Sequence, residues 1–136
     1  MANWLTAAII AFLLFGLWGF FPKLAVHYIS PGSAIVYEVL GVMVVGLVAL
    51  TLVGFRPEVH PKGILFAVLT GVTGMLGTLF FFYALQTGKV SVVASLTALY
   101  PLITILLAVV FLREEVTLRQ LLAMALAMVS LILFAA

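Results

Sequence analysis

Long apolar runs separated by short charged clusters dominate this sequence. The runs cover residues 4–21, 33–55, 63–86, 90–112 and 117–136. Each is close to the roughly 20 residues that a helix needs to cross the hydrocarbon core of a bilayer. Strands of a membrane barrel would alternate polar and apolar residues, whereas these runs are apolar on every side. The pattern therefore predicts five transmembrane helices joined by short loops.

Composition supports an all-α integral membrane bundle. Of the 136 residues, 67% are hydrophobic and 7% are charged, which leaves too little polar surface to cover a water-soluble core. Five spans and their loops account for nearly the whole chain, so we expect one transmembrane domain over residues 1–136. The net charge of +2 comes from few, scattered residues, which argues against a nucleic-acid partner. The chain has no cysteine, so disulfides and thiolate metal sites are excluded.

Local signals place several helix ends. The first helix is expected to end at Pro22, and a turn is expected at residues 28–32. Ser30 stands before a proline, which is a favourable start for the second helix. Thr117 and Gln120 have the spacing of a capping box, which predicts the start of the fifth helix. Residues 4–21 are longer than the apolar region of a signal peptide, so we interpret them as a retained helix.

The basic residues indicate how the helices cross the membrane. With five spans the termini lie on opposite sides. Four basic residues share the side of the N-terminus and two lie opposite; they are Arg56, Lys62, Arg113 and Arg119 against Lys23 and Lys89. This bias favours a cytoplasmic N-terminus in the inner membrane. Insertion in both orientations remains an alternative.

Several spaced motifs resemble those of a known family. They are Phe-Tyr-Ala-Leu at residues 82–85, Gly-Lys-Val-Ser-Val-Val-Ala-Ser-Leu at 88–96, Tyr-Pro-Leu at 100–102, Leu-Arg-Glu-Glu-Val-Thr-Leu-Arg-Gln at 112–120, and Trp18, Gly19 and Pro22 to Ala25 in the first helix. In this order they resemble the EamA-type module of the drug/metabolite transporter superfamily, across essentially the whole chain. One departure is that Tyr37, Glu38 and Val39 stand where that module often has an arginine.

The resemblance implies a five-helix module that usually occurs twice in one chain, with the copies in opposite orientations. This sequence holds one copy, as in the short single-module members. The resemblance therefore implies a homodimer or a complex with a sister module, since inverted repeats form the substrate site at their interface. Parallel and antiparallel pairing both remain open. The implied activity is secondary transport of a small organic solute by alternating access.

Glu38 is the only charged residue that lies well inside a run. It follows Pro31 by seven positions, or about 10 Å along a helix. Placing a carboxylate in the membrane costs about 2.5 to 3.5 kcal/mol, so it should face protein or water. We predict a proton-coupling or cation-binding role; the alternative is that it pairs with Lys23 and fixes two helices together. Gly41 and Gly46 lie near its face and would allow close helix approach or leave a cavity.

Three further side chains are substrate or coupling candidates. Lys23 follows Pro22 and either extends to the interface or faces inward as a counter-ion to Glu38 or an anion contact. Trp18 and Tyr37 could flank the same crevice between the first two helices, where an aromatic wall would suit an organic cation or amphiphile. The alternative for both is a place in the interfacial aromatic belt.

Proline and glycine mark two other helices. Pro101 lies in the middle of the fourth run and should kink it, either as a hinge for alternating access or as static curvature. Gly71, Gly74 and Gly77 repeat at three-residue spacing in the third run, which we interpret as a flat stripe for helix packing.

The sequence shows no enzymatic constellation. No His, Asp or Glu spacing indicates a metal site, no base is placed to activate a serine, and no glycine-rich phosphate loop is present. We therefore expect neither catalytic residues nor a cofactor. The favoured function is a dimeric secondary transporter or exporter of a small organic solute, coupled to protons through Glu38. The alternative is a non-transporting membrane subunit or a partner in flipping a lipid-linked substrate.

Overall fold

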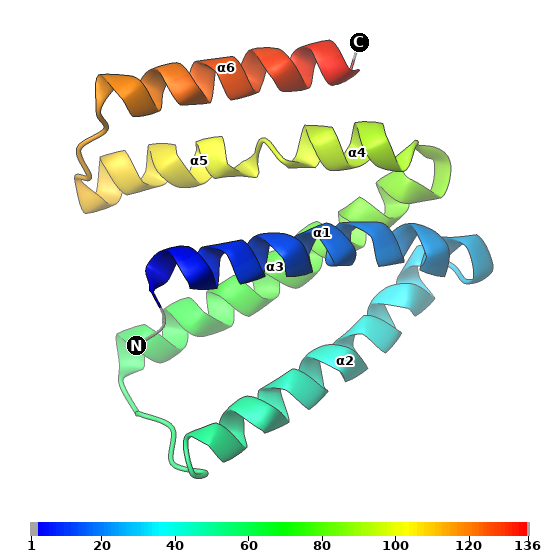
Figure 1. Cartoon of the computed structure of the whole chain (residues 1–136). Helices are drawn as coiled ribbons and strands as arrows, with labels where there is room; N and C mark the ends of the chain where they lie inside the picture. The colour runs from blue at the N-terminus through cyan, green and yellow to red at the C-terminus, as the bar shows by residue number, and fades with distance from the viewer. Residues whose placement is uncertain (1–2, 136) are drawn as a thin grey trace. The chain divides into compact units, whose positions relative to one another are not determined.

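The computed structural model describes residues 3–135, and the regular elements there are all helices (Figure 1). In chain order they are α1 (Trp4–Tyr28), α2 (Pro31–Leu52), α3 (Pro61–Thr87), α4 (Val90–Thr97), α5 (Tyr100–Leu107), the π-helical turn η1 (Ala108–Leu112) and α6 (Leu118–Ala135). Helices α1, α2, α3 and the segment Val90–Leu112 are long and apolar enough to cross a membrane, and α6 contains the shorter apolar stretch Leu118–Ser130. The predicted all-α membrane fold is confirmed.

Side-chain caps explain where two helices begin. Ser30 precedes α2, and its hydroxyl accepts a hydrogen bond from the backbone N–H of Ser33 at 3.3 Å. Thr117 precedes α6: its N–H donates to Oε1 of Gln120 at 2.8 Å, and the Gln120 N–H donates back to the threonine hydroxyl at 3.4 Å. Both predicted N-terminal caps, including the reciprocal capping box, are confirmed.

The predicted end of the first helix at Pro22 is wrong. Helix α1 continues through Pro22 to Tyr28, and the proline is buried within it. Proline removes only the intrahelical hydrogen bond from residue 22 to the carbonyl of Trp18. Packing of a helix against its neighbours can offset that loss, which is why proline is tolerated inside membrane helices. The charged residue Lys23, which ends the first apolar run of the sequence, therefore does not mark the end of the helix.

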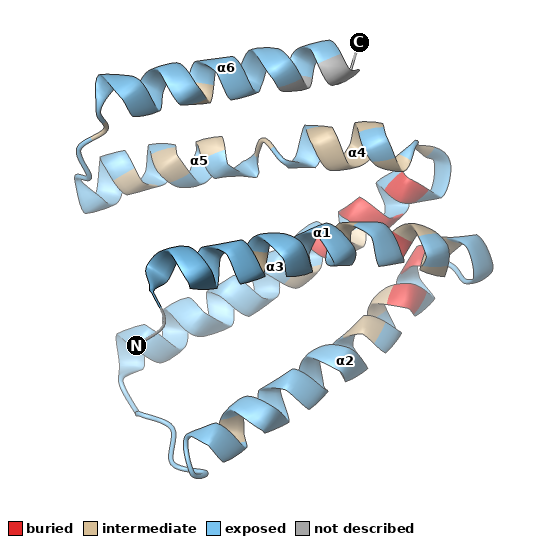
Figure 2. Cartoon of the chain, viewed as in Figure 1, coloured by how far each residue is buried: buried red, intermediate tan, exposed pale blue. Residues whose placement is uncertain are grey.

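The chain packs as two compact units, and the first of them extends to Thr87. Here α3 contacts both α1 and α2. The buried residues gather where α1 ends, α2 begins and α3 ends (Figure 2); they are Pro22, Pro31, Ala34, Thr78, Phe81, Phe82 and Leu85. From this end α1 and α2 diverge (Figure 1). The core of this unit therefore lies at one end of its helices.

The second unit begins at Gly88 and contains the broken fourth span. Turn residues Ala98 and Leu99 separate α4 from α5, and Pro101 occupies the first turn of α5. Proline fits that position because the first N–H groups of a helix have no intrahelical acceptor. Helix α6 packs against α4.

Polar hydroxyls inside the spans are satisfied within their own helices. Thr73, Thr78 and Thr97 donate to the carbonyls of Leu69, Gly74 and Val93 at 2.7, 2.9 and 2.9 Å. Large apolar side chains on these helices are meanwhile mostly exposed. Satisfied polar groups together with an apolar exterior are what a surface in contact with lipid requires.

Candidate functional site

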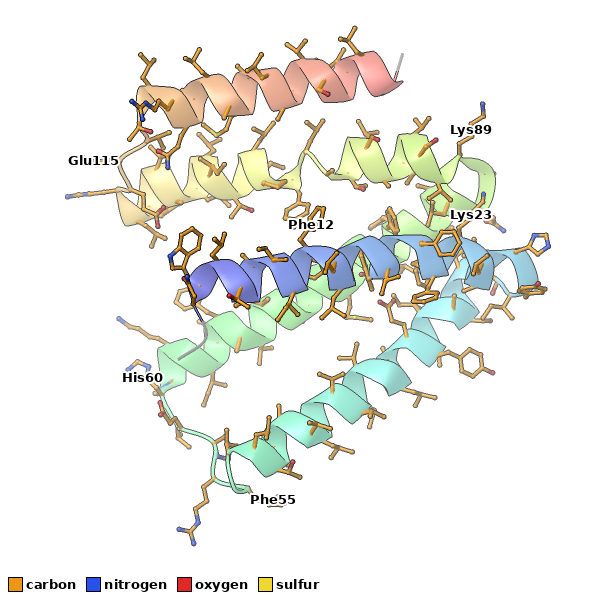
Figure 3. All side chains as sticks on the ribbon, viewed as in Figure 1. Phe12, Lys23, Phe55, His60, Lys89 and Glu115 are labelled. Atoms are coloured by element: carbon orange, nitrogen blue, oxygen red, sulfur yellow. The ribbon has the colours of Figure 1, made fainter. Side chains whose placement is uncertain are left out.

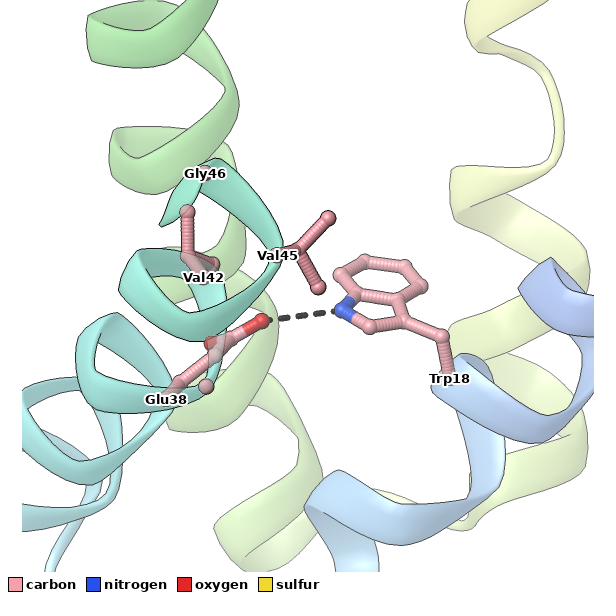
Figure 4. A pocket seen from close by; sticks show the side chains of 6 residues that line it. Trp18, Glu38, Val42, Val45 and Gly46 are labelled. Carbon is pink, nitrogen blue, oxygen red and sulfur yellow. Dashed lines mark hydrogen bonds between the residues drawn. The ribbon is translucent and has the colours of Figure 1, made fainter. Parts of the chain in front are cut away.

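A groove of about 520 Å³ lies between α1 and α2 in the first unit. Its lining residues are Trp18 from α1 and Glu38, Gly41, Val42, Val45 and Gly46 from α2 (Figure 4). The α2 positions follow helical spacing, so they form one face of that helix. Glu38 is the only ionisable residue of the lining, and the rest of the α2 face is apolar.

Glu38 and Trp18 meet across the groove (Figure 4). The indole Nε1–H of Trp18 donates a hydrogen bond to Oε1 of Glu38 at 2.9 Å. Oε2 of the same carboxyl group is buried and has no hydrogen-bond partner. A carboxylate oxygen without a donor is costly in a medium of low polarity. The two oxygens of Glu38 are therefore not equivalent, and one has unused capacity to accept a hydrogen bond or a proton.

The indole ring of Trp18 is held by α3. Its ring and that of Phe81 are stacked, with centroids 5.5 Å apart and planes 14° from parallel. Phe81 is buried in the core, so it fixes one face of the indole. Trp18 itself remains 41% exposed, and this remaining part of the ring lines the groove.

Two glycines make room in the groove. A Cβ atom added at Gly41 or at Gly46 would have no heavy atom within 4 Å outside the local backbone. Of the two predicted roles for these glycines, close helix approach is not what the structure shows. They leave open space beside Val42 and Val45 instead.

Lys23 lies on α1 and binds the end of α3 (Figure 3). Its Nζ donates a hydrogen bond to the carbonyl of Leu85 at 2.6 Å. Leu85 is in the last turn of α3, where carbonyl groups lack intrahelical donors and the helix dipole favours a positive charge. Lys23 thus donates to a carbonyl of α3, and Glu38 accepts from Trp18.

The other sequence candidates are not among the residues that line the groove. Tyr37 is 63% exposed and is not among the lining residues. Pro101 belongs to the second unit, where it helps to line an apolar cavity of about 140 Å³ with Met124 and Ala127 of α6. Ala127 therefore faces α5 within the unit. Across residues 3–135, no three His, Asp or Glu side chains lie close enough together to hold a metal ion.

The glycine stripe of α3 has no packing partner among the described residues. Added Cβ atoms at Gly71, Gly74 and Gly77 would meet nothing within 4 Å. The interpretation of this stripe as a packing surface therefore stays a prediction.

Sequence reasoning missed the contacts made by α3. Phe81, which fixes Trp18, is one of several consecutive aromatic residues at positions 80–83, and nothing in the sequence distinguishes it from its neighbours. The Leu85 carbonyl is a backbone group and carries no sequence signal. Gly41 and Gly46, at spacings of three and eight from Glu38, were the signal for open space beside the carboxylate.

Comparison with known proteins identifies the family. The model of the EamA-like transporter family matches residues 2–136. An uncharacterized protein of Methanocaldococcus jannaschii is 29% identical over 133 residues, which make up 94% of this chain and 95% of that protein. No solved structure matches the chain. The chain belongs to the EamA-like transporter family and is a multi-pass membrane transporter of small solutes.

Proposed function

We propose that this protein is a secondary transporter of a small organic solute that works as a dimer by alternating access and is coupled to protons through Glu38. The observation that carries this proposal is the carboxyl group in the groove, with Oε1 bound to Trp18 and Oε2 buried without a partner. A family of solute transporters needs a site for its solute, and this groove combines open space with a single ionisable group.

A coupling role requires Glu38 to exchange a proton during transport. A carboxylate is costly in a medium of low polarity, so this exchange requires a protein or water environment instead of lipid. In the proposed cycle, Oε2, which is buried without a partner, takes up the proton while Oε1 keeps its bond from the indole N–H.

The groove is open on one side, which supports a dimer. One module supplies Trp18 on one side and the α2 face on the other, and the surrounding apolar side chains are mostly exposed. A charged group beside such a surface requires a protein or water environment instead of lipid. A second copy, or a sister module, would supply the missing wall at the interface between repeats.

The break in the fourth span supports a hinge between α4 and α5. Ala98 and Leu99 interrupt the helix just before Pro101, so α4 and α5 can change their mutual angle at these two residues with little loss of hydrogen bonding. We propose that this break is the hinge for alternating access.

Reconstitution tests the coupling role of Glu38. The Glu38→Gln variant keeps the shape and an acceptor for Trp18 but cannot exchange a proton. In liposomes it should lose pH-gradient-driven flux of a radiolabelled panel of amines, amino acids and sugars, at least tenfold relative to wild type. Tyr37→Phe, an exposed neighbour outside the groove, is the matched control and should transport normally. Driven flux that is unchanged in Glu38→Gln, with the variant folded, would refute the coupling.

The same experiment separates transport from the alternative role. If the chain is a non-transporting subunit, or a partner in flipping lipid-linked substrates, the purified wild-type protein alone will show no solute-dependent flux in liposomes. That result would remove the proposed transporter activity of the isolated dimer.

A further inference from the structure

We propose that the groove selects an amphiphilic organic cation, with the positive group beside Glu38 and Trp18 and the apolar body along the Gly41 to Gly46 face of α2. This inference names the substrate class of the transport activity proposed above, and it rests on that proposal.

One end of the lining holds Glu38, whose Oε1 is bound to Trp18 and whose Oε2 is buried, and the remainder is apolar. Glu38 is its only ionisable residue, and Gly41, Val42, Val45 and Gly46 present only apolar side chains or hydrogen. The Nζ atom of Lys23 meanwhile contacts the carbonyl of Leu85 on α3. A charge at one end of an apolar groove is complementary to a molecule with an opposite charge at one end, and it disfavours anions.

The indole of Trp18 adds to the selection for a cation. Its N–H is bound to Glu38 at 2.9 Å, and Phe81 stacks on its ring, so the ring cannot rotate away without losing both contacts. The face of an indole ring carries negative π-electron density, which attracts a cation placed over it. An organic cation at this end would be attracted by the carboxyl group and the aromatic ring together. A neutral solute would gain little from either group.

The length of the groove limits the apolar body. Glu38 and Gly46 are eight positions apart, which corresponds to about 12 Å along a helix. The volume of about 520 Å³ lies in the range of sites for small organic molecules. Because Gly41 and Gly46 have open space over them, the far half of the groove exists only while those positions carry no side chain.

Fluorescence of Trp18 provides the binding assay. The chain has two tryptophans, so Trp4→Phe leaves Trp18 as the only one, and this substitution lies in the first turn of α1, away from the groove. In detergent, this protein is titrated with 4-phenylbutylamine, 4-phenylbutanol and 4-phenylbutyrate, which share a body and differ in charge. The amine should change the Trp18 emission saturably and bind at least roughly tenfold more tightly than the alcohol, with the acid weakest.

Removal of the charge tests the role of Glu38 in this selectivity. Glu38→Gln in the Trp4→Phe background should bind the amine and the alcohol with similar affinity. Equal affinities of the starting protein for amine and alcohol, or an amine preference that survives in Glu38→Gln, would overturn the inference.

A size test does not depend on the carboxyl group. Gly46→Val places a branched side chain in the far half of the groove and should lower the affinity for 4-phenylbutylamine at least fivefold. The affinity for benzylamine, which has a shorter apolar body, should change less than twofold. Val44→Phe adds similar bulk on α2 outside the lining and is the matched control. Equal weakening of the long and short amines in Gly46→Val, or weakening of both in Val44→Phe, would contradict the assigned position of the apolar body.

The binding experiment tests the substrate class, and the flux experiment tests the transport mechanism, so either proposal can be refuted without the other. Amine-selective binding without proton-coupled flux in liposomes would leave the site chemistry intact and refute the transporter mechanism. Coupled flux of another solute, without amine binding at Trp18, would support the mechanism and refute the substrate class.

Discussion

The two oxygens of Glu38 illustrate how a single residue carries two tasks. Oε1 holds Trp18 and thereby positions a wall of the groove, while Oε2 is buried and unpartnered. The sequence alone made Glu38 a candidate because it stands alone within an apolar run. It could not show which oxygen has a partner, because that depends on the rotation of α1 and α2 about their axes.

The hydrogen bond from Trp18 to Glu38 should contribute to stability. Trp18→Phe keeps an aromatic ring to stack on Phe81 and removes the N–H donor, which should cost about 1 to 2 kcal/mol because both carboxyl oxygens then lack a donor. Unfolding in detergent by sodium dodecyl sulfate titration measures the change. Trp4→Phe, at a residue that is 78% exposed, should be neutral. A Trp18→Phe protein as stable as wild type would show that this bond is not maintained in the membrane protein.

Lys23 should stabilise the first unit through its bond to α3. Lys23→Met keeps the apolar length of the side chain and removes the ammonium group from the last turn of α3, with an expected cost of about 1 to 2 kcal/mol. Lys23→Arg retains a positive donor and should recover part of this loss. Lys89→Met, at an exposed position without a side-chain cap, is the control. The same unfolding titration reports all three, and equal effects of Lys23→Met and Lys89→Met would contradict the assigned contact.

At the scale of helices, one proline lies within a continuous helix and another follows a break in a helix. Pro22 lies inside the continuous helix α1 and is buried, whereas Pro101 lies in the first turn of α5, after a two-residue break, and is exposed. The sequence predicted a helix end at the first and a kink at the second. Proline disfavours an uninterrupted helix in both cases, but the packing around it determines whether the helix continues. This packing comes from other helices and cannot be predicted from the local sequence.

Removal of Pro101 should join α4 and α5. Pro101→Ala restores an N–H that can donate to the carbonyl of Thr97, and alanine avoids the interior-helix penalty of about 3 kcal/mol for proline. Amide hydrogen exchange of the peptide covering residues 97–102 should slow by roughly tenfold or more, and flux should fall if the break is a hinge. Pro57→Ala, in the exposed loop before α3, is the control. Unchanged exchange would mean that the break does not depend on the proline.

At the scale of the whole molecule, the apolar runs were sufficient to predict the order of the helical segments, but not the division of the fourth run into α4, α5 and η1. Charged clusters and caps located most loops because these features act locally. The concentration of buried residues at one end of the first unit was not predictable. It involves Phe81, Phe82 and Leu85 on α3, a helix that packs against α1 and α2, and packing between helices distant in sequence carries no local signal.

The orientation in the membrane is a further whole-molecule prediction. Because the chain has no cysteine, single cysteines at Glu58 and Lys89 can be labelled without background. With a cytoplasmic N-terminus in the inner membrane, Lys89→Cys should react with an impermeant maleimide in intact cells, and Glu58→Cys only after permeabilisation. Labelling in the reverse pattern would contradict this orientation, and labelling of both sites in intact cells would show that both orientations are inserted.

The position of the core at one end of α1, α2 and α3 has a mechanical consequence. Each of these helices is held at its packed end, so a rotation there moves the opposite end of the helix. Helix α2 has 22 residues and so is about 33 Å long. A rotation of about 10° about the packed end would displace the far end of α2 by about 6 Å. A small rearrangement around Pro31 and Ala34 would therefore be amplified into a displacement as large as one helical turn at the opposite side of the membrane.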